Sequence, residues 1–66
     1  MARFGELVKE KRTEKSYSQN RLAKILKISQ SYMNQIEHGV RNPNFELLNR
    51  ICRLLEIELP WEEPET

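Results

Sequence analysis

Apolar residues recur at intervals of three and four along most of this 66-residue chain. That spacing places them on one face of an α-helix, whereas the strict alternation typical of a β-strand is rare. The sequence therefore predicts an all-α fold. The first helix is expected from about Ala2 to Lys15, with an apolar stripe formed by Phe4, Leu7 and Val8.

Two short helices are expected next, because the same start signal occurs twice. Ser18 and Ser29 each follow an apolar residue, and a serine in that position can accept hydrogen bonds from the free N–H groups of a first helical turn. The helices should occupy residues 19–26 and 30–38, almost without a linker. Gly39 then tolerates the left-handed backbone that ends the second of them.

A fourth helix is expected after Asn44, which can cap its first turn. Its core face should contain five residues at helical spacing: Phe45, Leu48, Ile51, Cys52 and Leu55. Cys52 is the sole cysteine, so it cannot form a disulfide within the chain, and a buried, unreactive thiol is expected. The lone cysteine fits a reducing compartment. The N-terminal run suggests neither a signal peptide nor a membrane span, so the expected location is cytoplasmic.

The third helix carries an unusual polar face. Opposite its apolar side, at about 100° per residue, lie four uncharged polar residues: Ser31, Asn34, Gln35 and His38. In a chain with 32% charged residues, a merely solvated face would usually carry Lys or Glu. Amide side chains both donate and accept hydrogen bonds, which suits recognition of base edges in the major groove of DNA. Gln30 lies in the first turn, the end of such a helix that typically enters the groove deepest. Tyr32 lies on the flank, where DNA contact and packing over the helix–helix corner are equal alternatives.

Charge is unevenly distributed, although the net charge is only +1. Residues 1–41 contain nine Lys or Arg and four Glu, a balance of +5, whereas residues 42–66 contain two Arg and six Glu, a balance of −4. Such asymmetry can steer one end of a molecule toward a polyanion. An ordinary solvated surface would also account for it.

Several short motifs occur in register along the chain: Ser18-Gln19, Leu22-Ala23, Ile28-Ser29, Ile36-Glu37-His38-Gly39, and Arg41 with Pro43. Together they resemble the Cro/phage-repressor-like helix-turn-helix family, often called XRE-like, and the resemblance extends over residues 4–61. It implies a compact lambda-repressor-like DNA-binding domain of four to five helices over residues 1–61. Within it the helix-turn-helix would occupy residues 18–38, followed by an acidic tail at 62–66.

The resemblance also implies roles for individual residues. Base reading is expected of Gln30, Ser31, Asn34 and Gln35, the third of which matches a position that contacts DNA in some members. Contacts with phosphates or the minor groove are expected of Gln19, Arg41 and Asn42. The positions of Tyr32 on the flank and His38 on the polar face of the third helix add these two residues to the expected contacts. Arg12 and Glu37 match a pair that ties the first helix to the end of the reading helix, with a free surface arginine as the alternative for Arg12.

Three departures from the family pattern affect the interpretation. Lys27 stands where many members have glycine in the turn, so either a non-glycine residue adopts a positive φ, at a cost of about 1 kcal/mol, or the turn differs. Cys52 stands where alanine is usual. Glu62-Glu63-Pro64 stands where relatives often continue into a fifth helix used for dimer contact. A homodimer would therefore depend on apolar residues near the C-terminal end: Leu55, Ile57, Leu59 and Trp61.

These features predict a sequence-specific regulator of transcription that binds double-stranded DNA, as a repressor acting as a homodimer on a palindromic operator. No cofactor, metal, small-molecule ligand or membrane partner is expected. An enzyme is not expected either, because one His and one Cys cannot form a zinc site or an obvious nucleophile–base pair, and no glycine-rich phosphate loop occurs. The alternative is a protein-interaction role such as the antitoxin of a toxin–antitoxin pair, for which five residues of acidic tail would provide little covering arm.

Overall fold

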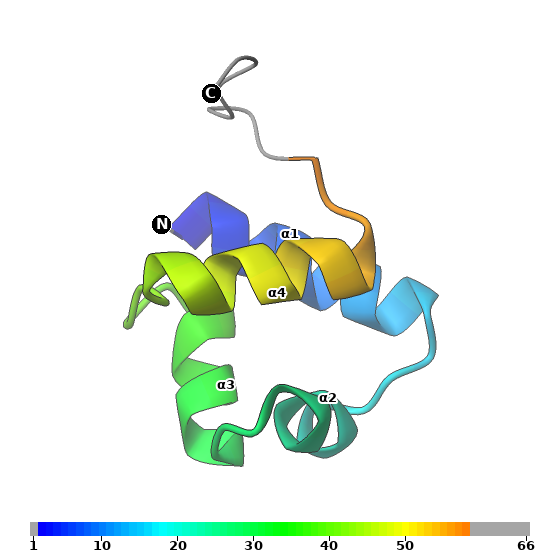
Figure 1. Ribbon diagram of the computed structural model, residues 1–66, viewed down its shortest axis with the longest axis horizontal. Helices are drawn as coiled ribbons and strands as arrows, with labels where there is room; N and C mark the ends of the chain where they lie inside the picture. The colour runs from blue at the N-terminus through cyan, green and yellow to red at the C-terminus, as the bar shows by residue number, and fades with distance from the viewer. Residues whose placement is uncertain (1, 59–66) are drawn as a thin grey trace.

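The computed structural model describes residues 2–58, which form four α-helices (Figure 1). The helices are α1 (Ala2–Glu14), α2 (Gln19–Leu26), α3 (Gln30–Glu37) and α4 (Phe45–Leu55). The described part of the chain contains no strand. The all-α prediction is confirmed, and the observed bounds of the first three helices lie within one residue of the expected ones.

The predicted capping residues begin three of the helices. The side chains of Ser18, Ser29 and Asn44 each accept a hydrogen bond from the backbone N–H three residues further on, at 3.0, 3.0 and 2.8 Å. Each bond satisfies a donor that has no partner within the helix, which typically contributes about 1 kcal/mol. Gly39 adopts a φ of 76°, the left-handed geometry predicted for the end of α3. Local sequence signals therefore determine where these elements begin and end.

The helices enclose one small core. In Figure 1, α1 and α4 lie against each other, α3 extends away from them, and α2 packs at the far end of α3. The core draws on every helix and on one residue beyond α4: Phe4, Val8, Leu22, Ala23, Leu26, Met33, Ile36, Leu47, Leu48, Ile51, Cys52, Leu55 and Ile57. No helix in residues 2–58 is both long and apolar enough to cross a membrane.

The predicted core face of α4 needs one correction. Phe45 is 68% exposed, and Leu47, which the predicted set omitted, is buried instead. At 100° per residue, Phe45 points within about 20° of the buried Cys52, but it lies in the first turn of α4, where the rest of residues 2–58 leaves its side chain uncovered. Cys52 is buried, as predicted, and burial raises the pKa of its thiol above the ordinary value. The thiol is therefore a packing group that resists ionisation.

Gly5 allows α1 to approach the end of α3 closely. A Cβ atom at this position would lie 2.5 Å from the carbonyl oxygen of Glu37 and closer still to that of Ile36. Real Cβ atoms do not approach backbone oxygens at such distances, so only glycine fits here without a shift of one helix. Gly5 thus sets the position of α1 against the C-terminal end of α3.

Candidate nucleic-acid interface

A tight turn joins α2 and α3. In Figure 1, α3 stands upright while α2 is viewed nearly end-on, so the two axes cross steeply. Lys27, the residue that ends α2, has φ 63° and ψ 42°, in the left-handed region. Of the two alternatives left open by the sequence, the chain adopts the first: a non-glycine residue accepts the positive φ. The N–H of Ile28 then donates to the carbonyl of Ala23 at 3.0 Å, which closes the turn.

The two sides of α3 differ sharply in exposure. Met33, Ile36 and Glu37 are buried, and they face the remaining helices. On the opposite side, Gln30, Ser31 and Asn34 are exposed, and Gln35 is half-buried at the edge of the same surface. The residues expected to read bases therefore share one accessible face of a single helix. None of these four carries a charge.

The half-buried Tyr32 shows the packing over the helix–helix corner that was one of its two alternatives, and it also contacts a cation. Its side chain packs against the core cluster, and its ring also supports Arg41, whose guanidinium carbon lies 4.9 Å from the ring centroid. A guanidinium at that distance from an aromatic face is attracted by the ring's quadrupole. Tyr32 therefore both covers the helix–helix corner and orients a cation.

The loop after α3 is tied to that helix by hydrogen bonds. The carbonyl oxygen of Gln35 accepts hydrogen bonds from the N–H groups of Val40 and Arg41, at 2.9 and 3.2 Å. Together with the stacking on Tyr32, these bonds hold Arg41 beside the exposed face of α3. Asn42, in the same loop, is exposed. His38 caps α3, is exposed, and has its ring Nδ1 2.9 Å from the carbonyl oxygen of Asn34.

A hydrogen-bonded chain of side chains links three helices beneath this face. The Arg12 guanidinium donates to both carboxylate oxygens of Glu37, at 2.6 and 3.2 Å, and to the carbonyl oxygen of Tyr17 at 2.9 Å. Only 2% of the Glu37 side chain and 13% of the Arg12 side chain are exposed. The predicted tie between the first helix and the end of α3 is thus present. Arg12 is not a free surface residue.

Gln19 extends this chain to the exposed face. Its amide nitrogen donates to Glu37 at 3.0 Å, and its amide oxygen accepts a longer hydrogen bond of 3.4 Å from Gln30. Gln19 is also the first residue of α2, so its own backbone N–H has no partner within the helix and can point at an anion. The side chain expected to anchor a phosphate thus touches one expected to read a base.

Four residues were expected to form a dimer contact, and two of them are buried in the core of the single chain. Leu55 is fully buried and Ile57 is 7% exposed, both in the core of the single chain. They stabilise the monomer and offer almost no surface to a second copy, so we omit them from a dimer surface. Leu59 and Trp61 lie outside the described residues, as does the predicted acidic tail at 62–66.

Sequence reasoning missed two contributors to the geometry of this face. Gly5, one of the two glycines of the chain, was not singled out, although a glycine inside a helical pattern is itself a signal of close packing. The hydrogen bonds of Gln19 to Glu37 and Gln30 join residues 18 and 11 positions apart, and no local pattern predicts them.

Two short helices crossing at a tight turn, capped at both starts and braced by a third, define a helix-turn-helix domain. Comparisons with known proteins place it more narrowly. The model of a family described as "Helix-turn-helix" matches residues 8–61. The chain belongs to this family, the Cro/phage-repressor-like or XRE-like helix-turn-helix proteins. The resemblance inferred from the sequence motifs is therefore confirmed.

Curated relatives from phage and bacteria share the domain. The chain is 39% identical over 57 residues to the "ImmF control region 10 kDa protein" of Bacillus phage phi105, covering 86% of this chain and 63% of that one. It is 43% identical over 54 residues to the HTH-type transcriptional regulator RamB of Mycobacterium tuberculosis, covering 82% of this chain and 11% of that one. For the HTH-type transcriptional regulator SlrR of Bacillus subtilis the identity is 39% over 57 residues, covering 85% and 38%.

The chain thus spans less than two thirds of the length of each of these relatives. No solved structure matches it at a significant level.

Proposed function

We propose that this chain is a regulator of transcription that binds double-stranded DNA sequence-specifically, and that it represses as a homodimer on a palindromic operator. The observation that carries the proposal is the exposed face of α3, where three uncharged polar side chains lie together and a fourth lies at the edge: Gln30, Ser31, Asn34 and Gln35. The names of its relatives support the proposal, since two of the three described above are transcriptional regulators.

The reading step follows from the chemistry of this face. The major groove of B-DNA admits an α-helix, and an amide side chain can contact the N6 and N7 atoms of adenine in a bidentate arrangement. Gln35 and Gln30 supply such amides at opposite ends of α3, with Ser31 and Asn34 between them. Carboxylates are absent from this set, so the face does not repel the phosphates on either side of the groove.

Anchoring is assigned to a second set of groups around the reading face. Arg41, held by the Tyr32 ring and the Gln35 carbonyl, presents a cation next to α3. The first turn of α2 presents N–H groups beside Gln19. Phosphate contacts of this kind fix the register of a protein on DNA and carry no direct sequence information. Asn42, Tyr32 and His38 complete the proposed backbone contacts.

Two copies of the domain would place their α3 helices in successive major grooves. Dimers of helix-turn-helix domains read half-sites about 34–36 Å apart, one turn of DNA. A protein bound in this way over a promoter excludes polymerase, which is the basis of the proposed repression.

Two variants test the division between reading and anchoring. Gln35→Ala should lose about 1–3 kcal/mol of binding free energy and relax preference at one base pair, because a base contact is lost. Arg41→Ala should weaken binding to all sequences similarly and flatten the salt dependence by about one unit of slope, because one phosphate contact is lost. Lys9→Ala, which removes an exposed cation from α1, serves as the charge control.

The measurement is selection of bound duplexes from a random pool, followed by salt-dependent titration of the best sequence and of scrambled DNA. No salt-sensitive binding to any duplex would overturn the regulator proposal. If Gln35→Ala and Arg41→Ala changed affinity and salt dependence in the same way, DNA binding would remain supported. The separate roles of reading and anchoring would then be wrong.

A further inference from the structure

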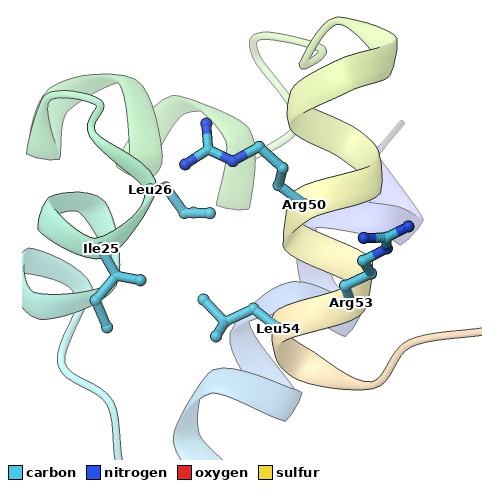
Figure 2. Close-up of a pocket in the computed structure, with 5 residues that line it drawn as sticks. All are labelled: Ile25, Leu26, Arg50, Arg53 and Leu54. Carbon is cyan, nitrogen blue, oxygen red and sulfur yellow. The ribbon is translucent and has the colours of Figure 1, made fainter.

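A groove with a volume of about 300 Å³ separates the last turn of α2 from the second half of α4. Ile25, Leu26 and Leu54 line its apolar part, and Arg50 and Arg53 line its side on α4 (Figure 2). In Figure 2, Leu54 points across the opening toward α2 and the Arg50 side chain extends toward Leu26, whereas the Arg53 side chain points away from Ile25 and Leu26. Ile25 is 40% exposed, so this apolar surface is only partly covered by the rest of residues 2–58.

The charged groups at this groove lack acidic partners within the described residues. The ion pairs within residues 2–58 are Lys11–Glu14, Arg12–Glu37 and Lys15–Glu56. None of them includes Arg50 or Arg53. Both arginines are exposed. An apolar floor with two cations on one side fits a segment in which a large apolar side chain is followed by carboxylates.

The chain itself contains such a segment after α4. Residues 59–63 read Leu-Pro-Trp-Glu-Glu, with the single tryptophan of the sequence directly before two glutamates. We propose that this segment of a second copy of the chain docks in the groove, with Trp61 on the apolar floor and Glu62 and Glu63 beside the arginines. The inference deepens the proposed homodimer, because it assigns both sides of its protein–protein contact.

The route of the chain after α4 favours a second copy over the same molecule. Glu56 turns with a φ of 59°, the N–H of Ile57 donates to the carbonyl of Cys52 at 2.9 Å, and the Ile57 side chain enters the core. At 100° per residue, Cys52 and Leu54 point about 160° apart around α4, and in Figure 2 the chain continues from the end of α4 away from the side that bears Leu54. The chain therefore leaves α4 on the side opposite the groove.

The length of the segment also argues against docking in the groove of the same molecule. The three residues from Glu58 to Trp61 extend at most about 11 Å, and crossing beneath the end of α4 already takes its full diameter of about 10–12 Å. Even a fully extended chain would bring only the backbone of Trp61 to the rim of its own groove. A segment from a second copy has no such limit. If each copy places its segment in the groove of the other, both grooves are filled and the two copies are related by a two-fold axis.

The contact should be weak, because each copy contributes only a few residues and the buried area falls below that of stable dimers. Assembly should be measured without DNA, by sedimentation equilibrium over a wide concentration range and by the fluorescence of Trp61. The chain should associate reversibly, with the Trp61 emission shifting to shorter wavelength as concentration rises. Trp61→Ala should weaken association at least tenfold.

Charge reversal identifies the groove. R50E/R53E and E62K/E63K should each be monomeric alone, because one side of the contact then repels the other. Mixing the two variants should restore association, since in the mixed dimer both grooves face a segment of opposite charge. R3E/K9E, two exposed positions on α1 with the same change in charge, should associate like the parent chain. Circular dichroism checks that every variant remains folded.

Two outcomes would overturn the proposal: a mixture that remains monomeric, or a short-wavelength Trp61 emission that does not depend on concentration, as docking within one molecule would give. Either could occur while the chain still binds DNA through α3. Conversely, restored association without DNA binding would remove the proposed function and leave this contact standing.

Discussion

The two sides of α3 differ in what holds them. The buried side is fixed by the core, by the ion pair of Glu37 with Arg12 and by the close approach of Gly5. The exposed side bears Ser31 and Asn34, whose side chains have no hydrogen bond within residues 2–58. One helix thus carries a side that determines position and a side left free for recognition.

This difference has a consequence for substitutions. Changes on the buried side should alter the stability of the domain, and through it the orientation of every group on the reading face. Changes on the exposed side should alter recognition while leaving stability almost constant. Gln19 is the exception, because it contacts Glu37 beneath the face and Gln30 on it.

The largest expected effect is that of Glu37→Ala. It leaves the Arg12 guanidinium, 13% exposed, without its carboxylate partner and removes the acceptor of the Gln19 amide. Breaking one partner out of a buried pair typically costs about 3–5 kcal/mol. In a domain this small, that loss should leave a substantial fraction unfolded at room temperature, measurable by urea denaturation followed by circular dichroism.

Glu37→Gln is the matched control for this variant. It keeps an oxygen acceptor of the same shape, so it should lose less free energy of unfolding than Glu37→Ala. If Glu37→Ala proved as stable as the parent chain, the ion pair would not be what positions the end of α3, and the contrast between its two sides would fail.

Gly5→Ala should have the next largest effect. In an exposed helical position this change usually stabilises by about 1 kcal/mol, because alanine favours the helix. Here the added methyl group meets the carbonyl oxygens of Ile36 and Glu37, so α1 must move away from α3. Overpacking of this kind costs about 1–3 kcal/mol. The urea midpoint of Gly5→Ala should therefore fall below that of the parent chain. A rise would show that α1 does not constrain α3.

Much of this fold follows from local signals in the sequence. Ser18, Ser29 and Asn44 mark helix starts, and Gly39 marks a helix end, through hydrogen bonds and backbone angles that involve only near neighbours. Phe45 was wrongly assigned to the core because helical periodicity gives the direction of a side chain about its own axis. It does not say whether another element covers that direction.

The candidate site was also predictable only in part. The polar face of α3 follows from periodicity and composition, and the Arg12–Glu37 pair was implied by the family resemblance. The cross-helix bonds of Gln19 and the seating of Arg41 on Tyr32 depend on how separate elements meet in space. Such tertiary contacts leave no repeating pattern in a single sequence.

A substitution in the turn that leads into α3 should have a smaller effect on the free energy of unfolding, and it should stabilise the domain. Lys27 holds a left-handed φ of 63°, which costs a non-glycine residue about 1–2 kcal/mol. Lys27→Gly relieves this strain but adds freedom to the unfolded chain, so a net gain of about 0.5–1 kcal/mol is expected.

Thermal unfolding of Lys27→Gly should then show a rise in Tm of a few degrees. Lys24→Gly, in the last helical turn of α2, is the control and should lower the Tm, because it brings the entropic cost of glycine without relieving strain. A fall in Tm for Lys27→Gly as well would show that the turn is not strained.

The smallest expected effect on stability is that of Asn34→Ala, which tests the free side of α3 directly. The Asn34 side chain is exposed, and the bonds that His38 forms go to its backbone carbonyl, which alanine retains. Alanine also has the higher helix propensity, so the free energy of unfolding should stay within about 0.5 kcal/mol of the parent value or rise slightly. Titration with the selected DNA should nonetheless show weaker binding, because the base contact proposed for Asn34 is lost. A large loss of stability would instead mean that Asn34 belongs to the scaffold, and the two sides of α3 would no longer divide positioning from recognition.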